Sequence, residues 1–74
     1  MPSALAMNVI GILGPSVGDF VARAKVSAAC KLAKLDIDSL EAKDLMSFAE
    51  KLALTCEPLG SQVALQIKRK VLTL

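Results

Sequence analysis

The sequence predicts a small all-α protein, a bundle of four helices with one short N-terminal helix and three longer ones. Hydrophobic residues make up 54% of the 74 residues but aromatic residues only 3%, whereas strands usually carry more β-branched and aromatic side chains. Glycine, proline and capping residues divide the chain into four segments, in which apolar residues recur at helical spacing. We expect a single domain over residues 1–74. Because a domain of this size buries a small share of its surface, we also expect a dimer.

The first helix is predicted over residues 4–13. Ser3 is a preferred N-cap residue, and Gly14 followed by Pro15 is the predicted stop, because glycine tolerates the left-handed conformation and proline cannot continue the hydrogen-bond ladder. No basic residue precedes the apolar run, and polar residues and a proline interrupt it. We therefore expect neither a signal peptide nor a membrane span.

The second helix is predicted to run from Ser16, as its N-cap, to about Leu35. Asp19 lies three residues after the cap, in a weaker form of the capping box. The helix is expected to end at residues 36–39, with the sequence DIDS, because aspartate and serine side chains bond backbone amides outside helices.

Capping and helix-breaking residues also bound the third and fourth helices. The third is predicted to begin near residue 39, with Asp38 and Glu41 as a capping pair, and to end before Pro58. Its apolar face comprises Leu45, Phe48, Ala49, Leu52, Ala53 and Cys56. The fourth follows Ser61 as N-cap, and its apolar face comprises Val63, Ala64, Ile67 and Val71.

The second helix carries apolar residues on two sides. On a helical projection we predict its main core face to be Val17, Phe20, Val21, Ala24, Ala28, Leu32 and Leu35. Nearly opposite lies a strip of mostly small residues, Ala22, Val26, Ala29 and Ala33, with Cys30 at its edge. Helix propensity explains exposed alanines without any partner, but it does not explain Val26. We therefore predict that another helix, from the first segment or from a second chain, covers this strip.

The small-residue strip leads to the predicted function, a helical protein–protein interaction module that forms a homodimer or a stable complex with a partner helix. The predicted interface comprises Ala22, Val26, Ala29, Ala33 and Leu54, with Leu65 and Leu72 as further candidates. Lys25 and Glu50 are expected to set the register of the contact.

The residue types also argue against catalysis. The chain has no histidine, the commonest general base and metal ligand. Cys30 and Cys56 are too few for a disulfide framework and are not spaced for zinc, so we expect buried free thiols and an intracellular, cytoplasmic protein. Acidic pairs fall at helix starts, where carboxylates cap helices. We expect no enzyme activity, no metal and no cofactor.

Basic residues suggest an alternative function. The predicted basic positions are Arg23, Lys31 and Lys34 on the second helix and Lys68, Arg69 and Lys70 on the fourth. If the bundle brought these together, a helical dimer could follow the phosphates of duplex RNA or DNA. A solvated helix face is the other interpretation of the same residues, and the net charge of +2 is modest for a nucleic-acid-binding domain.

A third possibility comes from a short motif. The stretch DIDSLEAKDL at residues 36–45 resembles the Asp-Ser-Leu signature of acyl and peptidyl carrier proteins. That resemblance implies that Ser39 begins a helix and carries a phosphopantetheine arm, with Leu40 opening the recognition helix. Carrier proteins are strongly acidic whereas this chain is basic, and capping alone also explains a serine at a helix start.

Overall fold

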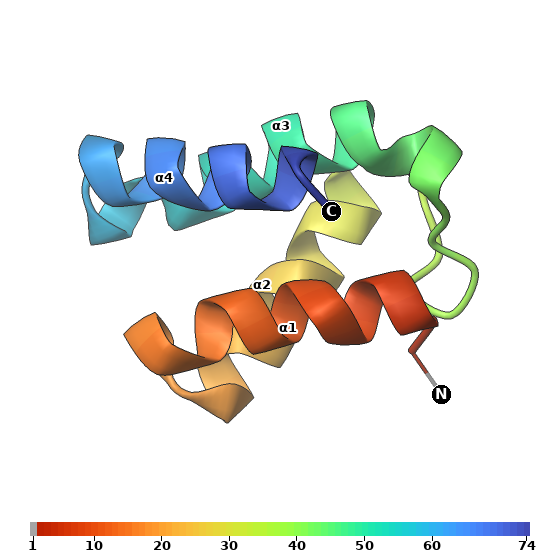
Figure 1. Cartoon of the computed structure of the whole chain (residues 1–74), viewed down its shortest axis with the longest axis horizontal. Helices are drawn as coiled ribbons and strands as arrows, with labels where there is room; N and C mark the ends of the chain where they lie inside the picture. Colours follow the sequence, from red (N-terminus) through yellow and green to blue (C-terminus); the bar gives the residue numbers. More distant parts are fainter. Residues whose placement is uncertain (1) are drawn as a thin grey trace.

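The computed structural model describes residues 2–74, and within them the chain is an all-α bundle without strands (Figure 1). Its α-helices are α1 (Ala4–Val17), α2 (Asp19–Leu32), α3 (Leu45–Cys56) and α4 (Ser61–Leu72), and its short 3-10 helices are η1 (Ala42–Asp44) and η2 (Glu57–Leu59). The predicted fold class is confirmed. The prediction of a short first helix is wrong, because α1 has 14 residues, as many as α2 and more than the 12 of α3 or α4.

The helices pack mainly on their neighbours along the chain. α1 packs on α2, α2 on α3 and α3 on α4, and α1 also contacts α4. In Figure 1, α1 and α4 lie toward the viewer, α2 crosses obliquely behind α1, and the segment between α2 and α3 closes one end of the molecule. The accessible surface of 4449 Å² is close to the roughly 4,400 Å² typical of a folded monomer of this mass. The single chain is therefore a closed globule.

The start of α1 matches the prediction and its end does not. The Ser3 hydroxyl accepts a hydrogen bond from the Ala6 amide at 3.1 Å, which confirms the N-cap. The helix nevertheless continues through Pro15, whose ring is exposed in the last turn, although proline normally disfavours such a position. Gly18, with a φ of 88°, ends α1 by donating to the Gly14 carbonyl at 2.8 Å. Ser16 lies inside α1 and caps nothing.

The bounds of α2 are correspondingly shorter than predicted. It begins at Asp19, directly after Gly18, so a single residue separates α1 from α2. It ends at Leu32 because Lys34 adopts a left-handed conformation with a φ of 58°. The Leu35 amide then donates to the Cys30 carbonyl at 2.8 Å, which satisfies one of the last carbonyls of the helix.

The predicted start of α3 near residue 39 is wrong. The chain first makes η1, where Glu41 and Asp44 form a reciprocal capping box, and α3 begins only at Leu45. The predicted end before Pro58 is confirmed, since α3 ends at Cys56. Glycine rather than serine caps α4, because Gly60 at a φ of 114° precedes the first helical residue.

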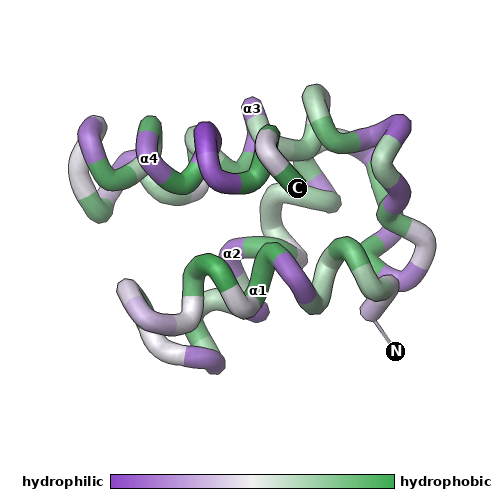
Figure 2. The backbone as a smooth tube through the Cα atoms, in the orientation of Figure 1, coloured by the Kyte–Doolittle hydropathy of each residue, from purple (hydrophilic) through white to green (hydrophobic). Residues whose placement is uncertain are grey.

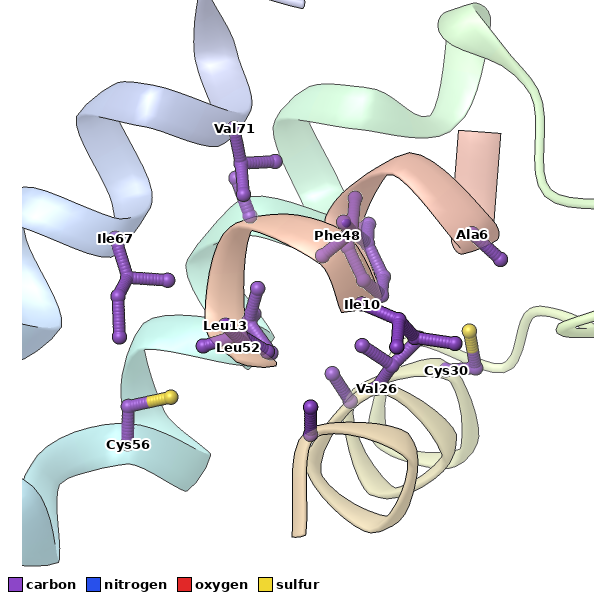
Figure 3. Packing of buried hydrophobic residues seen from close by; sticks show 14 of the residues in the cluster. Ala6, Ile10, Leu13, Val26, Cys30, Phe48, Leu52, Cys56, Ile67 and Val71 are labelled. Carbon is purple, nitrogen blue, oxygen red and sulfur yellow. The ribbon is translucent and has the colours of Figure 1, made fainter. Parts of the chain in front are cut away.

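The core lies between the four helices. Figure 3 shows Phe48 of α3 among side chains from α1, α2 and α4 that point into the same interior. The predicted faces of α3 and α4 are largely confirmed, with Phe48, Ala49, Leu52, Cys56, Ala64, Ile67 and Val71 buried and Leu45, Ala53 and Val63 partly buried. Along α4, hydrophilic and hydrophobic stretches alternate (Figure 2), as expected for a helix with one buried face.

Candidate interaction surface

The structure reverses the predicted roles of the two sides of α2. The small-residue side is the core face: Ala22, Val26 and Ala29 are 0% exposed and Cys30 is buried with them. We call these four residues the inner face of α2. In Figure 3, Val26 points from α2 into the interior, near Ile10 of α1. The predicted main core face is therefore wrong: most of its residues lie on the outside of the protein.

Side-chain size and charge explain this reversal. Small side chains let α1 and α3 approach the α2 backbone closely, so α2 can pack against two helices of its own chain. The inner face also contains no charged residue. Lys31, by contrast, is exposed on the outer side of α2, in the helical row next to that of Phe20 and Ala24, where its ammonium group can stay hydrated.

This arrangement corrects the predicted interface. Ala22, Val26 and Ala29 pack within their own chain and are not accessible to a second molecule, and Ala33 is partly buried just beyond the end of α2. The helices that cover the inner face are the chain's own α1 and α3. Leu54 of α3 is 57% exposed, so it stays available for the contact predicted for it.

The accessible apolar surface of α2 is on the opposite side. Phe20 is 86% exposed, Leu32 57% and Val21 39%, and the surface between them consists of exposed alanines. We call this set the outer strip of α2, comprising Phe20, Val21, Ala24, Ala28 and Leu32. A phenylalanine this exposed is unusual, because aromatic side chains normally contribute their large apolar area to a core or an interface.

Basic residues border the outer strip. The Arg23 guanidinium pairs with Asp19 one turn earlier at 3.3 Å, which neutralises it. The Lys25 ammonium donates to the Thr55 carbonyl at 2.7 Å and so joins α2 to the end of α3. Lys31 and Lys34 are exposed and form no ion pair with another described residue.

The second basic cluster does not extend this border. Arg69 and Lys70 are exposed and Lys68 is partly exposed on α4, a helix that packs on α3 and α1 rather than alongside α2. Of the six basic residues singled out in the sequence, Arg23 and Lys31 lie on α2, Lys34 lies just beyond its end, and the other three lie on α4, whose main contacts are with α3 and α1. The packing of α4 on α3 and α1 therefore gives no support to the single patch that the nucleic-acid alternative assumed.

The two thiols are buried and unactivated. Burial raises the pKa of the Cys30 thiol, and the nearby charges of Asp36 and Asp44 raise it further. Burial also raises the pKa of the Cys56 thiol, against smaller opposing effects of Thr55 and Lys25. Both thiols therefore favour the protonated form, which is the poorer nucleophile.

A small hollow lies at the end of α2. Its volume is about 250 Å³, and it is lined by Ser27, Cys30, Lys31, Leu35, Asp36 and Ile37. Among the described residues no group of three or more cysteine, histidine or carboxylate side chains is placed to hold a metal ion. The hollow brings one cation, one carboxylate and one hydroxyl near a protonated thiol.

Ser39 does not meet the geometry that the carrier-protein resemblance implies. It lies exposed at a bend, where its amide donates to the Asp36 carbonyl at 3.1 Å. α3 begins six residues later, at Leu45, so Leu40 opens no helix and is instead buried in the core.

Across residues 2–74, no helix has the length and apolar character to cross a membrane. Comparisons of this chain with protein-family models, with curated proteins and with solved structures find no match.

Proposed function

We propose that the protein acts by associating with another protein helix through the outer strip of α2, without catalysing a reaction. The observation that supports this proposal most is Phe20, at 86% exposure in line with further exposed apolar residues. Of the two aromatic side chains in the protein, one thus contributes nothing to the core. The folded chain leaves the Phe20 side chain in solvent, and a partner helix that covers the strip would bury it.

The strip has the chemistry of a helix-docking face. Covering a large apolar side chain contributes about 1.5–3 kcal/mol, so Phe20 and Leu32 would dominate the affinity. Ala24 and Ala28 between them let a helix approach closely. Lys31 and Lys34 at the border would stay hydrated and orient the partner rather than hold it.

Nuclear magnetic resonance tests this proposal on the labelled chain. One series dilutes the protein alone, and a second adds a synthetic amphipathic helix of leucine, alanine and glutamate. We expect amide shifts at positions 20, 21, 24, 28 and 32 in at least one series, and their loss in Phe20→Ser. Leu65→Ser, which removes an exposed leucine of α4, is the matched control and should leave the shifts unchanged. Absence of shifts in both series, or shifts confined to α4, would overturn the proposal.

A second candidate function is the binding of duplex RNA or DNA. It is favoured by Lys31 and Lys34, which are exposed and make no ion pair with residues 2–74. Binding through phosphates predicts affinity that falls steeply with salt. The double variant Lys31→Glu/Lys34→Glu should abolish it while helical content stays unchanged, and Lys68→Glu/Lys70→Glu on α4 is the control. Equal binding by both double variants would exclude the border of α2 as the site.

We also propose a cellular location for the protein, the cytoplasm. Two free, buried thiols suit a reducing, cytoplasmic compartment, where thiols are not oxidised to disulfides. Fractionation of cells that express the chain with a small tag would test this placement.

A further inference from the structure

We infer that the partner of the outer strip is a second copy of this chain, docked with its α2 antiparallel, so that Phe20 packs on the partner's Leu32 and Ala24 on the partner's Ala28. This inference rests on the proposed function and names the partner of the same surface. It depends on three features of α2: the order of side-chain sizes, the distribution of charge and the area of the strip.

The side chains along the outer strip are arranged symmetrically by size about its centre. Phe20, Ala24, Ala28 and Leu32 follow one row at intervals of four residues, with large side chains at the ends and small ones in the middle. Two helices that cross are closest at the crossing point and separate on either side of it. Alanines at the centre allow the close approach, and the large residues fill the widening gaps. A two-fold interface requires such a self-complementary surface.

The charges favour the antiparallel direction over the parallel one. In the first half of α2, Asp19 neutralises Arg23 through the 3.3 Å ion pair, whereas Lys31 and Lys34 at the other end have no acidic partner among the described residues. A parallel pair would set these lysines against their copies. An antiparallel pair sets them beside the Asp19–Arg23 ion pair of the other helix, while Lys25 is held on the Thr55 carbonyl, and it also opposes the two helix dipoles.

The area is sufficient for a weak, specific dimer. On the scale of 150–250 Å² for a large aromatic side chain, the outer strip presents roughly 400 Å² of apolar surface. Two strips bury about 800 Å² together, and the stems of the bordering Arg23 and Lys31 bring the total to the roughly 1,000 Å² that a specific interface needs. Because each chain is already a closed globule, we expect a dimer in exchange with folded monomer.

Disulfide trapping tests both the partner and the direction. Two single variants, Ala24→Cys and Ala28→Cys, are oxidised separately and as a mixture, with the unchanged protein as control because its own thiols are buried. In the proposed antiparallel pair, position 24 faces position 28, and a disulfide requires about 4.4–6.8 Å between Cα atoms. The mixture should therefore cross-link at least about tenfold faster than either variant alone. Phe20→Ser added to both variants should abolish the difference.

The other outcomes overturn the inference and separate it from the proposed function. Fast cross-linking of Ala24→Cys with itself would indicate a parallel pair. A monomeric mass at all concentrations in sedimentation equilibrium, together with shifts caused by the synthetic helix, would mean that the strip binds a different protein. Shifts in neither resonance series would refute the strip as a docking surface altogether. Dimerisation that weakens in Leu65→Ser but not in Phe20→Ser would place the contact on α4.

Discussion

The two phenylalanines occupy opposite environments. Phe48 of α3 is 0% exposed at the centre of the core, whereas Phe20 of α2 is 86% exposed. The helix that carries Phe20 buries alanine, valine and cysteine instead. Size and hydrophobicity alone therefore do not decide which side of a helix faces the core. In α2, close approach to two neighbouring helices takes precedence over the burial of the largest side chain.

The first prediction compares the contributions of the two phenylalanines to the free energy of unfolding. Phe48→Ala leaves a cavity in a closed core and should lower the free energy of unfolding by about 3–5 kcal/mol, much of the stability of a domain this small. Phe20→Ala should change it by less than about 0.5 kcal/mol, as surface substitutions usually do. Urea denaturation at low protein concentration measures both. Equal losses in the two variants would mean that Phe20 packs within the folded chain.

The second prediction compares the two sides of α2. Ala29→Glu places a carboxylate on the inner face, where nothing neutralises it, and should cost about 3 kcal/mol or more. Ala28→Glu, one position earlier on the outer strip, should leave the circular dichroism spectrum and unfolding midpoint nearly unchanged while it prevents association. Sedimentation equilibrium measures the loss of association in Ala28→Glu. A folded Ala29→Glu variant that fails to associate would restore the interface predicted from the sequence.

The third prediction concerns the outer side of α1. Gly11 lies exposed in mid-helix, and a Cβ atom added there meets nothing within 4 Å. Gly11→Ala should raise the free energy of unfolding by about 0.5–1 kcal/mol because alanine has the higher helix propensity. Gly60→Ala is the contrasting control, since a φ of 114° disfavours any side chain. Destabilisation by Gly11→Ala, seen in thermal unfolding, would reveal a close contact on this side.

The smallest effect is expected from pH. Burial raises the pKa of both thiols, so the folded chain keeps these protons at a pH where the unfolded chain has lost them. Stability should be constant below the unfolded cysteine pKa of about 8.5 and should fall as pH rises above it. Urea titrations from pH 7 to just below the lysine range measure the slope. The double variant Cys30→Ala/Cys56→Ala should be less stable throughout but should lose less stability with pH, and an unchanged slope would exclude the thiols as its source.

The sequence predicts most of this fold because strong local signals coincide with tertiary packing. The Ser3 cap, the end of α3 before Pro58 and the buried faces of α3 and α4 all follow from residue types whose local preference agrees with their environment. The start of α3 escapes prediction because two pairs of acidic residues have the spacing of a capping pair. The sequence does not distinguish Asp38 with Glu41, the predicted pair, from Glu41 with Asp44, the pair that forms the capping box. The passage of α1 through Pro15 escapes prediction because it runs against the local preference of proline.

The candidate surface escapes prediction for a different reason. The apolar periodicity of α2 is satisfied equally well on both sides, so hydrophobicity does not separate them. The distribution of charge does separate them, because the sector formed by Ala22, Val26 and Ala29 contains no charged residue, whereas Lys31 lies on the side of the helix that carries Phe20. In a helix with two apolar sides, the absence of charge indicates the core better than the presence of an aromatic residue does.

The very short connection at Gly18 also has a consequence for how the chain folds. A single residue joins α1 to α2, and residues 57–60 join α3 to α4, so these pairs form contacts that are local in sequence. Proteins dominated by local contacts fold in microseconds to milliseconds. We expect two helical hairpins to form first and then dock across the segment 33–44. Because loop closure entropy grows only with the logarithm of length, insertion of a few glycines and serines into that segment should slow folding only slightly.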